Sequence, residues 1–252
     1  MKRILGIAIL VSSLLLLSSC KDDPKKEDPT VPTYDLQLNF SLQKGGQPYT
    51  MNQVVSFDSV QSVRFDLLLV YLSRIELQRS SGEWVEIADV RFLDFSNSQV
   101  TLDLKAPTGS YTALRMGVGL DSTQNASDPN SFPLDHPLSS QNGMYWSWAT
   151  KYRFIIMEGR ANMGTLDPNT DALLAWHPGA DAFYRKYTFQ NSIEVTSGAN
   201  TPLDFTIELE NVFKGSNGSI DFINENQSHT EPDDYYIAEK FIWNFGEAIE
   251  LN

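Results

Sequence analysis

The chain has 252 residues, 32 acidic and 19 basic side chains, a net charge of −13 and one cysteine. An acidic surface repels phosphate groups, so this charge disfavours nucleic acids and anionic membrane surfaces as partners. With one cysteine in the chain, no internal disulfide can form.

Residues 1–20 have the pattern of a lipoprotein signal peptide. Lys2 and Arg3 precede an apolar stretch over residues 4–17, which is too short to span a bilayer comfortably, and the sequence reads LSSC at 17–20. Small residues before a cysteine resemble a lipobox, in which the signal is removed and Cys20 carries the lipid. An ordinary signal peptide with an incidental cysteine is the alternative. We predict lipidation at Cys20 and anchoring in the outer membrane, because several acyl chains bind a bilayer stably.

Residues 21–33 are rich in charges and prolines and have few apolar side chains. Such a segment buries too little apolar surface to fold, so it is predicted to be a disordered tether between the lipid and the domain at 34–252. Its first residues, KDD at 21–23, resemble the surface-export signal of Bacteroidetes lipoproteins. That resemblance implies exposure on the cell surface, and a generic charged linker is the alternative.

Residues 34–252 are predicted to form one domain of short strands separated by turns. Residues 35–42 alternate polar and apolar side chains, as a half-buried strand does. Glycine, proline and serine clusters mark the turns. Further strands are predicted at 63–72, 74–79, 84–87, 90–95, 100–104, 111–118, 152–158, 187–195 and 203–209. The predicted fold class is therefore all-β, a single β-sandwich-like domain with long loops and a C-terminal helix.

Two segments depart from the strand pattern. Residues 121–141 show no periodicity and are rich in Asn, Asp, Ser and Pro, which indicates a long loop that is either functional or mobile. Residues 233–249 repeat apolar side chains at helical spacing after a Pro-Asp-Asp start. This second segment is the predicted C-terminal helix.

Acidic and amide side chains offer two weak candidate sites. Asp121, Asn125 and Asp128 have calcium-binding atoms, but their spacing matches no fixed calcium loop, so a polar turn is favoured. Glu158 and Asp121 could form an acid/base pair, although such pairs are easily found among 32 carboxylates. The sequence contains no phosphate-binding loop, nucleophile elbow or His-Glu-x-x-His motif. We therefore predict that the protein is not an enzyme.

The most distinctive segment is 143–160, with the sequence GMYWSWATKYRFIIMEGR. It concentrates aromatic side chains and places Trp146 and Trp148 one residue apart. Each indole buries a large area and needs a partner for its N–H. The block is therefore either the centre of a core or the wall of a site, and the sequence leaves both open.

The chain has three histidines, His136, His177 and His229. Imidazole is the commonest metal ligand, and copper or zinc sites need two or three such groups to converge, which sequence spacing does not show. His177 has the best local pattern, because it follows Trp176 at the end of a predicted strand and precedes a Pro-Gly turn. A structural or solvated imidazole is the alternative for each. For His229 that alternative is a hydrogen bond at the entry to the final helix.

Several motifs follow one another in a distinctive order. They are YLSRIEL at 71–77, PTGSY at 107–111, GVGLD at 117–121, GMYWSW at 143–148, YRF at 152–154, EG at 158–159 and WHPG at 176–179. This order resembles the MbnP-like family of secreted bacterial β-sandwich proteins. The resemblance implies copper binding, because histidines and an oxidised tryptophan form the metal site of characterised relatives. It places His177 at the family's His-x-Gly position and makes Trp146, Trp148 and Trp176 candidates for a modified or site-lining tryptophan.

The first strand departs from the family pattern. Relatives often have Phe-x-His there, whereas this chain has Phe40, Ser41 and Leu42. Either His136 or His229 replaces the missing ligand, or this branch keeps the fold without the metal.

Two functions therefore remain open. One is an anchored lipoprotein that binds copper or a similar transition metal through His177, His136 and His229. The other is a non-catalytic interaction module that presents exposed aromatic side chains to a glycan or a partner protein.

Overall fold

A computed structural model describes residues 31–57, 60–146, 150–162 and 171–252. The predicted signal peptide, the lipidation site Cys20 and most of the predicted tether lie outside these residues, and so does Trp148. Pro32–Asn252 form one compact unit with a single apolar core.

The first sheet has five strands, ordered β17, β13, β1, β2, with β6 also paired to β1. Leu36, Leu38, Phe40 and Leu42 alternate with more exposed residues along β1, so the predicted half-buried strand is confirmed. β1 is parallel to β13 and antiparallel to β6. The bounds are β1 (Thr33–Lys44), β2 (Gln47–Pro48), β6 (Gln99–Pro107), β13 (Thr201–Glu208) and β17 (Ile249–Leu251).

The second sheet has eight strands, ordered β12, β7, β4, β10, β11, β16, with β3 and β5 also paired to β4. Its central strand β4 runs from Val60 to Arg79, where the sequence predicted two strands. Arg74 has φ +49° at an irregularity in the pairing, so a β-bulge bends the strand without ending it. The other bounds are β3 (Val55–Phe57), β5 (Trp84–Asp94), β7 (Gly109–Val118), β10 (Ile155–Asn162), β11 (Ala172–Trp176), β12 (Arg185–Val195) and β16 (Gln227–Ser228).

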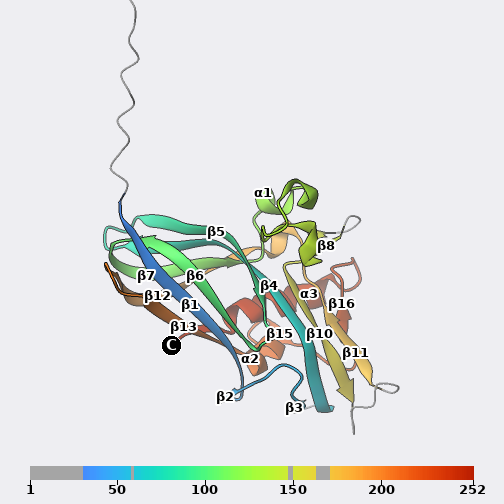
Figure 1. Ribbon diagram of the computed structural model, residues 1–252. Coiled ribbons are helices and arrows are strands. Elements are labelled where there is room, and N and C mark those ends of the chain that lie inside the picture. The colour runs from blue at the N-terminus through green and yellow to red at the C-terminus, as the bar shows by residue number, and fades with distance from the viewer. Residues whose placement is uncertain (1–30, 58–59, 147–149, 163–170) are drawn as a thin grey trace, which may run out of the picture. The chain divides into compact units, whose positions relative to one another are not determined.

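The two sheets pack against each other in one half of the domain, where β1, β6 and β13 lie beside β7 and β12 (Figure 1). Phe189 of β12 meets Phe205 of β13 across this layer, with ring centroids 5.2 Å apart. The predicted β-sandwich-like, all-β class is thereby confirmed.

Two helices cover the other half of the second sheet. Trp176 of β11 stacks on Phe241 of α3 (Tyr235–Glu247) and packs on Phe213 of α2 (Leu209–Phe213). The predicted C-terminal helix is confirmed as α3, which ends before β17 because Ile249 already pairs with Ile207. A small hairpin, β14 (Lys214–Gly215) and β15 (Gly218–Ser219), lies between the helices in sequence.

Short helical turns occupy the segment predicted to be a long loop. They are α1 (Ser122–Asn125), η1 (Pro129–Ser131) and η2 (Ser140–Asn142), and a hairpin of β8 (Tyr145–Trp146) and β9 (Lys151–Tyr152) follows. A further turn, η3 (Asp181–Phe183), precedes β12. The side chains considered for calcium are engaged within the protein, since Asp121 binds Arg74 and Asp128 caps η1. The favoured polar turn is what the structure contains.

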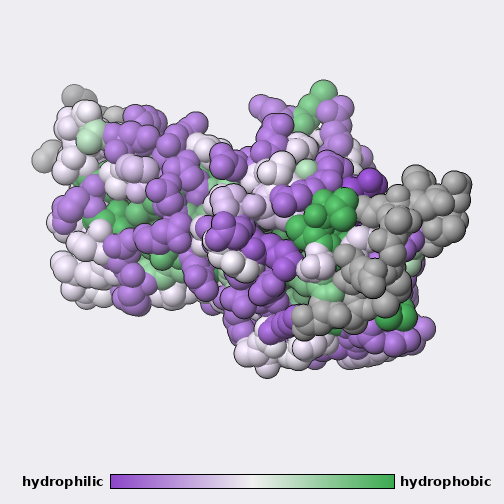
Figure 2. All heavy atoms as spheres, turned by 90° about the horizontal axis from the view of Figure 1, so that it is seen from below, coloured by the Kyte–Doolittle hydropathy of each residue, from purple (hydrophilic) through white to green (hydrophobic). Residues whose placement is uncertain are grey.

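Hydrophilic side chains cover most of the face drawn in Figure 2, and hydrophobic ones show there only in separate patches. Among the described residues, no helix is both long enough and apolar enough to cross a bilayer.

Candidate functional site

Three of the predicted site residues meet at one place, although they come from distant parts of the chain. Trp146 belongs to β8, His177 follows β11 and His229 follows β16. The imidazole centroids of His177 and His229 are 5.0 Å apart. The Trp146 ring lies 5.4 Å from the His229 ring, stacked at 29°, and 5.5 Å from the His177 ring, edge-on. The aromatic block therefore contributes to the wall of a site as well as to the core.

The end of β11 sets the position of His177. Successive side chains of a strand point to opposite faces, so the buried Trp176 faces the helices and His177 faces away from them. The backbone N–H of His177 donates to the Ser228 carbonyl at 2.8 Å, and the backbone carbonyl of His177 accepts from Thr230 Oγ1. Gly179 completes the His-Pro-Gly turn, because a Cβ there would lie 2.3 Å from the Tyr152 carbonyl oxygen. The turn is thus packed tightly against β9.

The Glu158 carboxylate is hydrogen-bonded to the imidazole Nε2 of His177. Its Oε1 lies 2.9 Å from His177 Nε2, and the Glu158 side chain is about half exposed. The pairing of β10 with β4 shifts between Glu158 and Gly159, and a Cβ at Gly159 would lie 2.2 Å from the Arg64 carbonyl oxygen. Only glycine permits this close approach of the two strands. The Glu-Gly motif therefore places the carboxylate that binds His177 next to the glycine at the bulge.

The surroundings keep His177 uncharged. Burial, then the electrostatic effects of Arg153 and His229, lower the pKa of His177 from 6.5 to about 3. The Glu158 carboxylate, 2.9 Å from Nε2, acts in the opposite direction but does not outweigh the effect of burial on the pKa of His177. With Nε2 held by Glu158, the Nδ1 atom is buried and has no hydrogen-bond partner. A neutral imidazole with an unused nitrogen is the form that binds metal ions.

Arg153 lies against the same indole. Its guanidinium carbon is 4.6 Å from the Trp146 ring centroid, and one terminal nitrogen donates to the Gly143 carbonyl. Its Nε is buried without a hydrogen-bond partner, and burial lowers the pKa of the group. A cation over an indole face is attracted by the ring electrons, so Arg153 steadies Trp146.

Two other predicted site residues lie elsewhere. The His136 ring stacks on Phe132 at 4.2 Å, and its Nδ1 accepts from the Leu138 N–H, so it is bound within its own loop. Trp176 is fully buried, and its indole N–H donates to the Glu225 carbonyl. The structure therefore brings His177, His229 and Trp146 together and does not join His136 or Trp176 to them.

Within the described part of the chain, no group of three or more His, Cys, Asp or Glu side chains could hold a metal ion by itself. The candidate metal ligands at this place are the imidazole nitrogens of His177 and His229, beside the indole of Trp146. Glu158, His177 and His229 also line a groove of about 350 Å³ that runs along β10 and β11. A small ligand could reach the pair along it.

The sequence analysis missed two residues of this site. It considered Glu158 as an acid/base partner of Asp121 and as part of the EG motif, whereas Glu158 binds His177 and Asp121 binds Arg74. Arg153 appeared only within the YRF motif. At the first-strand position, Leu42 is a core residue of the first sheet, where it pairs with Ile207, whereas His177 follows a strand of the second sheet.

Comparison with known proteins agrees with this architecture. A family model described as MbnP matches residues 33–234. Among solved structures, MbnP from Methylosinus trichosporium is similar with a TM-score of 0.54 and 19% identity, over 82% of this chain and 88% of that chain. At that identity the structural likeness concerns the fold. No curated protein matches the sequence.

Proposed function

This chain belongs to the MbnP family, and from that premise we propose that it binds copper or a similar transition metal at His177 and His229 beside Trp146. The family is associated with copper, and the two imidazoles are the ligands that suit it. The observation that carries the proposal is the meeting of both rings against one indole. The role proposed is binding rather than catalysis.

The residues present fit a copper ion in their chemistry. The buried Nδ1 of His177 lacks a hydrogen-bond partner, which is costly unless a ligand satisfies it. Because Glu158 accepts a hydrogen bond from Nε2–H, it favours the His177 tautomer whose free lone pair is on Nδ1. Carboxylates fix the tautomer of metal-binding histidines in the same way. Copper would supply a Lewis-acidic, redox-active centre there. His177 and His229 would hold it, Glu158 would orient the first ring, and Arg153 would hold the indole.

We propose further that lipid on Cys20 anchors the protein in the outer membrane, with the domain exposed at the cell surface. The lipobox-like sequence and the KDD segment support this location. An anchored domain would retain a captured ion at the membrane.

Copper retention by the purified protein tests the metal site. After incubation with copper and desalting, the wild type should keep about one equivalent, as expected for a single site. His177→Ala and His229→Ala should each lose most of it. His136→Ala is the matched control, because it removes an imidazole that is bound within its own loop.

Copper that survives both His177→Ala and His229→Ala would contradict the site. A wild type that keeps no copper would contradict the function and favour the alternative, an interaction module for a glycan or a partner protein.

A further inference from the structure

Asn125 is an amide buried at the end of α1, with 2% of its surface exposed. Its Oδ1 accepts from the Tyr152 N–H at 3.1 Å. Its Nδ2 donates to Asp181 Oδ1 at 2.7 Å and to the Thr150 carbonyl at 3.3 Å. One side chain therefore binds the backbone on both sides of Lys151 and also the turn before β12.

Asn125 binds β9, and β9 is paired with β8, the strand that contains Trp146. Among the strands that the structure describes, β9 pairs with β8 alone, with Tyr145 opposite Tyr152 and Trp146 opposite Lys151. Strands of two residues in a two-stranded sheet are marginally stable without outside support. The position of the indole beside His177 and His229 therefore depends on contacts that fix this hairpin from outside.

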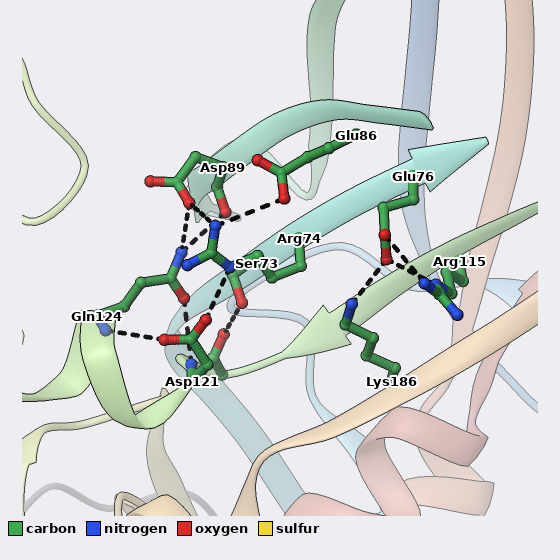
Figure 3. A network of polar contacts seen from close by, with 10 residues as sticks. Ser73, Arg74, Glu76, Glu86, Asp89, Arg115, Asp121, Gln124 and Lys186 are labelled. Carbon is green, nitrogen blue, oxygen red and sulfur yellow. Dashed lines mark hydrogen bonds and ion pairs between the residues drawn. The ribbon is translucent and has the colours of Figure 1, made fainter. Parts of the chain in front are cut away.

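α1 is itself tied firmly to the second sheet, as Figure 3 shows. Arg74, at the bulge of β4, binds Asp121 and Asp89, each at 2.7 Å. Asp121 and Gln124 form a capping box at the start of α1, and Gln124 Nε2 also donates to Asp89. These contacts hold α1, and with it Asn125, against β4 and β5. The bulge at Arg74, where the sequence analysis predicted a break between two strands, thus directs this arginine toward the helix that carries Asn125.

We propose that Asn125 is a positioning residue that holds Trp146 at its distance from the His177–His229 pair, an inference that rests on the metal-binding function proposed above. The path runs from Arg74 through α1 to the Asn125 amide, then across β9 to β8. Asn125 touches neither the histidines nor the indole in any contact found among the described residues, so it acts through the hairpin.

The metal-free protein provides the first test, because an indole ring shifts the NMR signals of protons near its face. The imidazole C–H signals of His177 and His229 should carry this shift, and Trp146→Phe defines its loss. In Asn125→Ala both signals should move toward their Trp146→Phe positions. Asn142→Ala is the matched control, since this amide binds the His136 and Pro137 carbonyls in the same loop.

A polarity swap keeps the inference testable if Asn125→Ala does not fold. Asn125→Asp places a carboxylate against Asp181 and should displace the hairpin by repulsion. Adding Asp181→Asn restores the hydrogen bond to residue 181 with reversed polarity but not the one to the Thr150 carbonyl, so the histidine signals should return part of the way toward the wild type. A merely structural role would lower stability in these variants without moving those two signals.

Copper affinity is the second measurement, by competition with a chelator. Asn125→Asp should bind copper more weakly, by no more than about 10-fold, the lower end of the loss for direct partners of a ligand, because Asn125 contacts no ligand; the double variant should recover part of that loss. Histidine signals that stay unchanged in folded Asn125 variants would overturn the inference, whether or not copper binds. A wild type that retains no copper would defeat the proposed function but leave the NMR result decisive for Asn125.

Discussion

The buried His177 should make the metal-free protein less stable as the pH falls from 7 to 5. Burial first, and then Arg153 and His229, lower the pKa of His177 to about 3 in the folded state, against 6.5 for an ordinary histidine. Below pH 6.5 the unfolded chain binds a proton at this residue that the folded chain does not bind. The free energy of unfolding therefore decreases as the pH falls from 6.5 toward 3.

The magnitude at pH 5 follows from the unfolded-state pKa and hardly depends on the exact folded value. Each pH unit below 6.5 costs about 1.4 kcal/mol until the folded ring begins to bind the proton. At pH 5, about one and a half units below 6.5, the loss due to His177 is about 2 kcal/mol. This is a large fraction of the stability of a typical domain.

Urea unfolding at pH 7 and pH 5 in the presence of a chelator measures this effect. His177→Gln removes the titrating ring and keeps a polar side chain, so its stability should change by about 2 kcal/mol less between the two pH values than that of the wild type. His136→Gln controls for the loss of an imidazole from the loop. Equal pH dependence in the wild type and His177→Gln would refute the argument that the fold keeps this ring neutral.

Two further outcomes follow from the strand bulge and from the proposed anchor. Gly159→Ala should lower the free energy of unfolding by about 1–3 kcal/mol, because its Cβ would overlap the Arg64 carbonyl oxygen; a urea midpoint equal to that of the wild type would show that β4 and β10 can separate there without cost. Cys20→Ser should abolish lipid attachment, so the protein should leave the detergent phase in phase partitioning, and its continued partition with detergent would contradict the anchor.

Local patterns in the sequence were sufficient for most of the elements. The alternation along residues 35–42 predicted β1, and the helical spacing at 233–249 predicted α3, because each pattern records which side of one element is buried. The break placed between 63–72 and 74–79 was wrong, since Arg74 bends β4 at a bulge without interrupting it. A bulge depends on the register with neighbouring strands, which one strand's sequence does not contain.

The sequence by itself determined the chemistry available to this protein: three imidazoles, an aromatic block, one cysteine after an apolar segment, and motifs in the order of one family. Only the tertiary structure decided which of these side chains meet. His177 and His229 are distant in sequence, and their rings lie 5.0 Å apart because parallel pairing of β11 with β16 brings their two strand ends together. His136 precedes the aromatic block closely in sequence, yet it is held by Phe132 and Leu138 in its own loop. Long-range strand pairing sets such distances, and spacing along the chain does not encode them.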